Sequence, residues 1–291
     1  MGIKRTRVPF GLLCTIPALV VLASVILVPL ARTILMSFQN YVLVEPAHIG
    51  SWAGLQNYIA VGQDKEFWNS VLRSLEFASC VLLGQLFLGM TIALVLNGSI
   101  RLVAIWRTLF MLPWILPQAQ IVLLSIWMFN TQYGIINWFV EMLGGQRQIW
   151  FNSSVSMIAL VVINIYRGFP FMMLMLIAGL QSIPLDVIEA ARVDGANELQ
   201  TFRYVTIPHL RPVLLVLVLT GYIWYMPHFM TIWTLTGGGP ANRTFTLALS
   251  TYQKAFLDYD FGVASAQGVT WLILTIVVCI LVIGLWGRRD R

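Results

Sequence analysis

Six long runs of apolar residues alternate along the chain with polar segments that hold most of the charged side chains. The hydrocarbon core of a bilayer is about 30 Å thick, so a helix needs about 20 apolar residues to cross it. The runs cover residues 8–31, 77–97, 102–129, 155–180, 213–235 and 263–286. The pattern therefore predicts an all-α polytopic membrane protein with six transmembrane helices, built as a single transmembrane domain over residues 1–291.

The first run follows a basic start of Lys4, Arg5 and Arg7, as a secretory signal peptide would. The apolar part of a signal peptide usually spans about 7–15 residues and ends at a small-x-small cleavage site. This run is longer and ends without a clear site of that kind. We therefore expect a retained helix.

Composition agrees with a membrane protein. Only 10% of the residues are charged and 58% are hydrophobic, whereas soluble domains carry about 25% charged residues. This excludes a soluble globular protein. The net charge of +6 follows from membrane topology, so it does not indicate nucleic-acid binding.

The distribution of lysine and arginine predicts the orientation, because these residues are enriched in cytoplasmic loops. With both termini in the cytoplasm, eleven of the 18 cations fall inside and six outside, while Arg167 lies within a run. This topology assigns the polar segment 181–211 to the cytoplasm.

Segment 181–211 has a helical pattern in two parts. Leu185, Ile188 and Ala191 form an apolar stripe after Pro184, and residues 199–205 repeat that spacing beyond Gly195. We expect two short amphipathic helices joined by a bend at Gly195. Membrane-surface helices are usually rich in lysine and arginine, whereas acidic residues outnumber basic ones here. The segment therefore favours a protein partner over lipid headgroups.

The spacing of Glu189-Ala190-Ala191, Gly195 and Val205-x-Ile207-Pro208 resembles the EAA loop of permease subunits in binding-protein-dependent ABC importers. Val205 and Ile207 replace the Ile and Leu that are frequent in that family. The resemblance implies that segment 181–211 carries a coupling helix which docks on an ATPase subunit. The implied coupling residues are Glu189, Ala190, Ala191, Asp194, Gly195 and Pro208.

Further elements resemble the sugar-type permeases of this family, which include the maltose and glycerol-3-phosphate systems. They lie at residues 112–117, 127–137, 164–171 and 235–240. The resemblance implies a type I ABC importer permease in the bacterial cytoplasmic (inner) membrane. It also implies a second homologous permease subunit, two ATP-binding subunits and an extracytoplasmic solute-binding protein as partners. The chain itself would hold no cofactor, and ATP-Mg would bind to the ATP-binding subunits.

The resemblance also implies a carbohydrate site in the middle of the membrane, for an oligosaccharide, a polyol or an acidic sugar. The matching residues are Trp114, Gln118, Asn164, Arg167, Gly168, Phe171, Gly221, Trp224 and Tyr225. Independently, the residues of this set between 164 and 171 share one helical face. Aromatic rings can stack on a pyranose and amides can bind its hydroxyl groups. Packing between helices is the alternative role for each aromatic residue, and in maltose-type systems only one of the two permease subunits contacts sugar.

Arg167 is the most costly residue of the chain, because a cation near the centre of a transmembrane helix costs about 2.5–3.5 kcal/mol. The run around it contains no acid, and Glu76 at the edge of the second run is the only acid near a run. Arg167 then either pairs with another subunit or a carbonyl group in a structural role, or binds the substrate through hydroxyl groups, a carboxylate or a phosphate.

Other functions find less support in the sequence. A secondary transporter usually shows internal repeats, and none is evident here. None of the three lysines follows a glycine, so the chain lacks a phosphate loop of its own. No HExxH or GxSxG motif is present, and the cysteines and histidines lack metal-ligand spacing. We therefore expect a non-enzymatic transport subunit without a metal site, whose outer segments 39–73 and 235–260 meet the binding protein.

Overall fold

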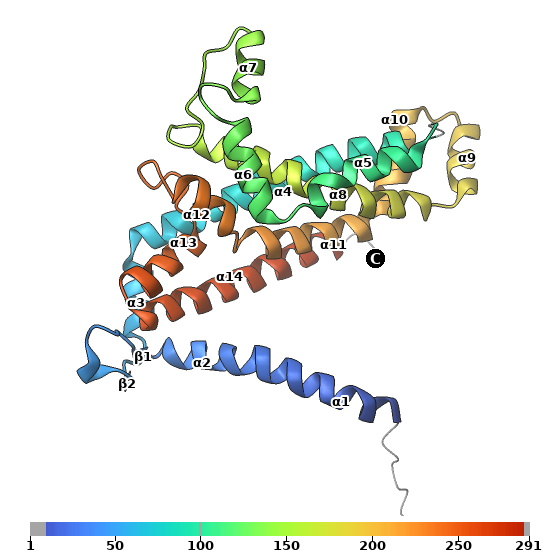
Figure 1. The fold of residues 1–291 in the computed structure, drawn as a ribbon. Helices are drawn as coiled ribbons and strands as arrows, with labels where there is room; N and C mark the ends of the chain where they lie inside the picture. The colour runs from blue at the N-terminus through green and yellow to red at the C-terminus, as the bar shows by residue number, and fades with distance from the viewer. Residues whose placement is uncertain (1–9, 99–100, 288–291) are drawn as a thin grey trace, which may run out of the picture. The chain divides into compact units, whose positions relative to one another are not determined.

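The computed structural model describes residues 10–98 and 101–287, most of which are helical (Figure 1). The chain folds into two compact units. The described part of the first unit comprises residues 10–65 and 251–273, and that of the second comprises residues 66–98, 101–250 and 274–287.

In the first unit, α1 (Phe10–Leu22) continues through a π-helical turn (Ala23–Leu27) into α2 (Val28–Met36). None of the residues in its most apolar stretch is buried against protein, as expected for a helix that faces lipid or another chain. The predicted run began at residue 8, which lies outside the described residues. The helix extends five residues beyond the predicted end at residue 31.

A small polar cap follows α2. It contains a two-stranded antiparallel sheet of β1 (Gln39–Asn40) and β2 (Ser51–Trp52), a 3-10 turn (Pro46–His48) and α3 (Gln56–Gln63). The buried Asn57 side chain donates hydrogen bonds to the carbonyl groups of Ser37 and Gln39. The Phe261 amide donates to the Tyr41 carbonyl and joins this cap to the start of α14 (Phe261–Gly287).

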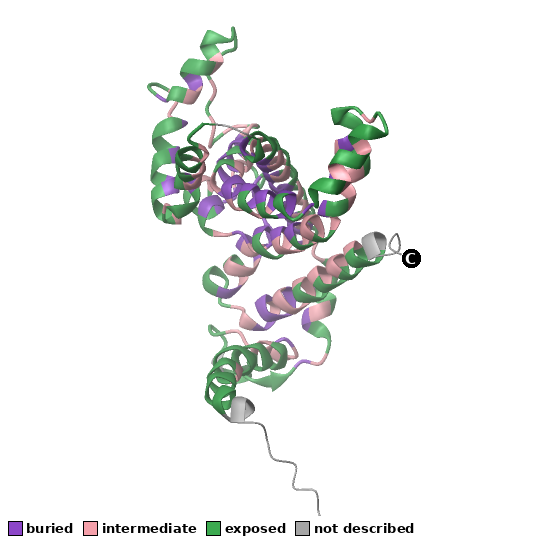
Figure 2. Cartoon of the chain, turned by 90° about the vertical axis from the view of Figure 1, so that its right-hand side faces the viewer, coloured by how far each residue is buried: buried purple, intermediate pink, exposed green. Residues whose placement is uncertain are grey.

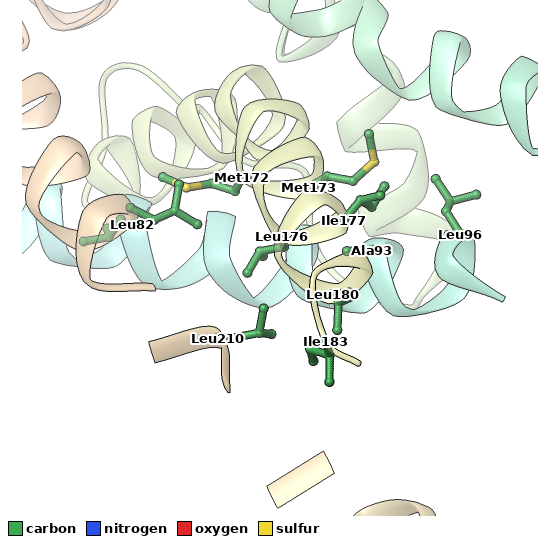
Figure 3. Packing of buried hydrophobic residues seen from close by; sticks show 11 residues of the cluster. Leu82, Ala93, Leu96, Met172, Met173, Leu176, Ile177, Leu180, Ile183 and Leu210 are labelled. Atoms are coloured by element: carbon green, nitrogen blue, oxygen red, sulfur yellow. The ribbon is translucent and has the colours of Figure 1, made fainter. Parts of the chain in front are cut away.

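The second unit is built around three long helices, α4 (Lys65–Asn97), α8 (Ser156–Gln181) and α11 (Ile207–Tyr225). Leucine, isoleucine, methionine and alanine side chains from these helices form its buried cluster (Figure 3). Figure 2 shows buried residues inside this group of helices and exposed residues on the outward faces. Many exposed residues are large and apolar, as expected for surfaces that meet lipid or other subunits.

Small residues allow α4 and α8 to approach closely, as is common between transmembrane helices. A Cβ atom added to Gly89 of α4 would lie 2.9 Å from the Met172 Cβ and 3.0 Å from the Met173 amide nitrogen. Because these atoms belong to or adjoin the backbone of α8, they have little freedom to move away. Glycine at position 89 is therefore required by the distance between the helices.

The third apolar run is not one straight helix. It forms α5 (Val103–Ile115) and α6 (Gln118–Met128), which are bent by 94° relative to each other. Leu116 adopts an extended conformation before Pro117, because the proline ring disfavours a helical conformation in the preceding residue. The prediction of a continuous helix over residues 102–129 is corrected in this respect.

The fifth run also differs from its prediction of residues 213–235. One helix runs from Glu198 to Tyr225, made of α10 (Glu198–Thr201), a π-helical turn (Phe202–Thr206) and α11. It ends near Pro227, and α12 (Met230–Thr236) is separate. The second amphipathic helix expected after Gly195 is therefore the first part of a long helix. The π-helical turn leads directly into α11, so the helix is not interrupted at Pro208.

Shorter elements complete the fold: α7 (Ile135–Met142), α9 (Leu185–Val193), and α13 (Leu247–Tyr252) with a π-helical turn (Gln253–Leu257). Within the second unit, α9 and α10 lie at the end where α8 finishes, and α7 and α12 lie at the opposite end (Figure 1). Five of the described helices are long and apolar enough to cross a membrane, and α5 with α6 makes a sixth if the pair is one broken span.

The contact at Gly89 leads to a stability prediction. Gly89→Val is expected to lower the free energy of unfolding by about 1–3 kcal/mol, because overpacking forces side chains or backbone to shift. The matched control is Gly268→Val in α14, where an added Cβ meets nothing within 4 Å. Thermal unfolding in detergent, followed by circular dichroism, measures both. Equal midpoints for the two variants would contradict the close approach at Gly89.

Candidate functional site

A cavity of about 380 Å³ lies between the helices of the second unit. Six of the nine residues predicted for the carbohydrate site line it: Trp114, Arg167, Gly168, Phe171, Trp224 and Tyr225. They come from α5, α8 and α11, which are distant in sequence. The structure thus places these six residues around one space, while their role in substrate binding stays a prediction.

Aromatic rings form one wall of the cavity. Trp114 and Phe171 stack with ring centroids 6.0 Å apart and an interplanar angle of 25°. Trp224 lies 5.1 Å from Phe171 on its other flank. The two tryptophans are 44% and 46% exposed, so their rings are only partly covered by the chain itself. Such a surface offers flat apolar faces on which the C–H face of a sugar ring can stack.

Arg167 brings a positive charge to the same cavity. It lies near the middle of α8, 11 residues after Ser156 and 14 before Gln181. Its Nε atom is buried and, among the described residues, has no hydrogen-bond partner. None of the ion pairs formed within residues 10–98 and 101–287 involves it. Within the described residues, no acid therefore neutralises the guanidinium group.

Glu76, the acid considered from the sequence, lies elsewhere. It borders a separate groove of about 400 Å³ together with Cys80 and Arg243. This groove shares no lining residue with the cavity at Arg167. Within the part of the chain that the structure describes, Glu76 is thus not positioned to neutralise Arg167.

The other three predicted residues do not line the cavity. Asn164 is fully buried behind the wall, where its Nδ2 donates to the Leu160 carbonyl. Gln118, the first residue of α6, donates a hydrogen bond to the hydroxyl group of Thr231 in α12. Gly221 packs against Leu82 of α4, whose side chain a Cβ at this position would overlap. These three residues therefore lie outside the cavity lining. Sequence spacing on one helical face does not distinguish a residue that lines a cavity from one that packs behind it.

Sequence reasoning missed five lining residues: Gln85, Met172, Ile223, Pro227 and His228. Gln85 is the only amide inside the apolar run 77–97 before its last residue, and polar residues within a membrane are usually functional. That signal was present in the sequence. The sequence shows only that His228 lacks metal-ligand spacing. In the structure its ring stacks on Phe77 and its Nε2 lies 3.0 Å from the Thr231 hydroxyl.

The predicted coupling residues lie at one end of the second unit, on and after α9. Glu189, Ala190, Asp194 and Gly195 are exposed, and Ala191 and Pro208 are partly exposed. Leu185 and Val193 are also exposed, at 71% and 88%. The chain thus presents an acidic helix with uncovered apolar side chains, which is a surface suited to a protein partner.

Gly195 ends α9 with a defined backbone geometry. Its φ is +84°, and the Ala196 amide donates back to the Ala191 carbonyl. This is the glycine-capped helix end in which left-handed backbone satisfies the last carbonyl groups. A Cβ at position 195 would meet nothing within 4 Å. Backbone conformation therefore explains this glycine, and crowding between the two helices does not.

One helix connects the exposed end that carries the predicted coupling residues to the cavity. Asn197 caps its start with a capping box to Gln200, and the helix runs to Tyr225, which lines the cavity. Its continuity gives a direct structural link between the two regions.

Comparison with known proteins adds independent findings. Residues 85–289 match the family model described as "Binding-protein-dependent transport system inner membrane component". The chain is 32% identical over 293 residues to the trehalose/maltose transport system permease protein MalF of Thermococcus litoralis, covering 99% of this chain and 97% of that protein. It is also 32% identical to the sulfoquinovosyl glycerol transport system permease protein SmoG of Agrobacterium fabrum, covering 94% and 89%.

The fold has a counterpart among solved structures. A chain in the crystal structure of a bacterial alginate ABC transporter, solved in complex with an alginate pentasaccharide-bound periplasmic protein, matches with a TM-score of 0.78. The match covers 97% of this chain and 96% of that chain at 16% identity. At this identity the likeness shows a shared fold.

Proposed function

The chain belongs to the family of binding-protein-dependent transport system inner membrane components, and from this premise we propose that it imports an acidic carbohydrate. Family membership confirms a multi-pass inner-membrane transport subunit without its own ATPase. With the shared fold, it confirms the predicted permease architecture. It also argues against the alternative of a self-sufficient secondary transporter.

The observation that carries the proposal is a free cation beside an aromatic wall. Relatives are named for trehalose/maltose and for sulfoquinovosyl glycerol, which supports a carbohydrate as the substrate class. The rings of Trp114, Phe171 and Trp224 suit a pyranose. An unpaired arginine inside a membrane is costly, and a carboxylate or phosphate on the sugar would pair with it through charge-assisted hydrogen bonds.

The rest of the importer follows from the same premise. A second, homologous permease subunit would complete the translocation path, and two ATP-binding subunits carrying ATP-Mg would dock on α9. A solute-binding protein would deliver the sugar at the opposite end of the second unit, near α12. Movement of α9 would reach the cavity through the helix that starts at Glu198 and ends at Tyr225.

A neutral sugar is the second candidate. In that case an acid of the partner permease subunit would pair with Arg167, and the guanidinium group would be structural. The half-exposed faces of Trp114 and Trp224 are compatible with either substrate.

Arg167→Gln distinguishes the two candidates. The variant retains polar side-chain groups and removes the charge, so uptake of an acidic sugar is expected to fall at least about tenfold, the value of a hydrogen bond to a charged group. Uptake of the carboxyl-reduced counterpart of the same sugar should change little. Proteoliposomes with the complete importer measure both, and Arg167→Lys, which keeps the charge, is the control. Equal losses for the two sugars, or failure to assemble, would assign Arg167 a structural role.

Gly195→Val tests coupling through α9. A β-branched residue costs about 1–2 kcal/mol in the left-handed conformation, so the variant should insert normally but import about tenfold less per ATP hydrolysed. Gly195→Asn is the matched control, because asparagine tolerates this conformation. ATP hydrolysis and uptake are measured together in proteoliposomes. Full transport by the valine variant would show that the shape of this loop does not matter for coupling.

Crosslinking from the outer loop after α12 tests whether this loop contacts the solute-binding protein. The buried Thr244 side chain donates to the Gly239 carbonyl and bonds the Thr236 hydroxyl, so the loop is held in one shape. A photo-crosslinker at the exposed Asn242 should capture the solute-binding protein. The same probe at Leu199, which is 74% exposed beside α9, should capture an ATP-binding subunit instead. Capture of only lipid or the ATP-binding subunit from Asn242 would contradict the proposal.

A further inference from the structure

Gln85 of α4 brings a polar side chain from outside the predicted set into the cavity. The residue lies in the middle of the second apolar run, is 1% exposed and lines the cavity beside Gly168 and Tyr225. A buried amide in an apolar setting is costly unless each of its polar atoms has a partner.

The amide nitrogen has two partners in the chain. Nε2 donates to the backbone carbonyl of Asn164 at 2.8 Å and to the Tyr225 hydroxyl oxygen at 2.5 Å. The Asn164 carbonyl can only accept a hydrogen bond. A flipped amide would place two acceptors against each other, so the nitrogen faces α8 and the orientation of the side chain is determined.

The amide oxygen has no partner. Oε1 is buried and, within the described residues, accepts no hydrogen bond. Leaving such an acceptor unpaired costs about 1–3 kcal/mol. Gln85 borders the cavity, but Oε1 itself is covered, so a molecule in the cavity supplies the missing donor only when the side chain shifts slightly towards it. A carboxylate cannot donate, whereas a sugar hydroxyl can.

Tyr225 complements this acceptor. Its oxygen accepts from Gln85, so its own proton is free for another acceptor. The pair therefore holds an acceptor and a donor at the edge of the cavity. A hydroxyl group can engage both at once, because it donates and accepts.

Gly168 provides the space for this arrangement. A Cβ at position 168 would overlap the Gln85 amide and approach the Tyr225 hydroxyl. Arg167, the neighbouring residue, lines the same cavity. The cation of Arg167 and the neutral pair of Gln85 and Tyr225 thus lie at the same cavity.

We propose that Gln85 is a specificity-determining residue that accepts a hydrogen bond from a hydroxyl group of the substrate. The proposal rests on the proposed function, since it requires a carbohydrate in this cavity. The substrate is then a sugar that carries both an anionic group and a free hydroxyl group. Arg167 binds the anionic group and Gln85 binds the hydroxyl group.

A cycle between residue and ligand tests this inference. The complete importer in nanodiscs is titrated with methyl glucuronide and with its 2-, 3- and 4-deoxy analogues, and binding is followed by quenching of tryptophan fluorescence. Gln85→Leu should weaken binding of methyl glucuronide about tenfold, the usual effect of one lost buried hydrogen bond. For the analogue that lacks the hydroxyl group bound by Gln85, wild type and variant should bind equally.

Gln85→Glu is the second variant and remains informative if the leucine variant fails to assemble. Its carboxylate would share the cavity with Arg167 and neutralise the guanidinium charge. Preference should then shift from methyl glucuronide towards methyl glucoside, while assembly measured by gel filtration stays intact.

The contradicting outcomes are distinct. A uniform loss for methyl glucuronide and every deoxy analogue, or no loss at all, would overturn the role of Gln85 and leave the proposed function standing. An unchanged preference in Gln85→Glu would do the same. Absence of quenching by methyl glucuronide in the wild-type importer would overturn the proposed acidic-sugar site, and this inference with it.

Discussion

The apolar interior of a membrane cannot supply hydrogen bonds, so each polar group there must be paired by the protein or by its cargo. In this chain, the side chains of Gln118 and Thr231 bond to each other within the second unit, and Asn164 Nδ2 donates to the Leu160 carbonyl, while Asn164 Oδ1 is buried without a partner among the described residues. Buried atoms of Arg167 and Gln85 stay unpaired in the described structure, and both residues border one cavity. The substrate that we propose would pair with these two groups.

Close packing of α4, α8 and α11 gives this site its geometry. Gly89 sets the approach of α4 to α8, and Gly168 leaves room for the Gln85 amide between helices. Because Gln85 Nε2 bonds both Asn164 of α8 and Tyr225 of α11, the side chain ties three helices together at the cavity. Packing and binding therefore depend on the same contacts. A change in the relative position of α8 and α11 would alter both the amide orientation and the aromatic wall.

The helix from Glu198 to Tyr225 connects the cavity to the end of the second unit that carries α9. Its first turn is adjacent to the exposed acidic helix α9, and its last residue lines the cavity. The left-handed backbone at Gly195 ends α9 without a side-chain contact, so the shape of this end is a local property. In the function that we propose, a partner docked on α9 moves it against a helix that continues without a break to the cavity.

The sequence by itself determined the apolar runs, the isolated cation Arg167 and the bend at Gly195, because length, hydropathy and backbone preference are local properties. It did not determine which prolines break a helix: Pro113 and Pro170 remain inside α5 and α8, whereas the chain bends by 94° before Pro117. Nor did it show that Gln85 faces the cavity while Gly221 faces Leu82. Those facts depend on contacts between helices far apart along the chain, so only the tertiary structure decided them.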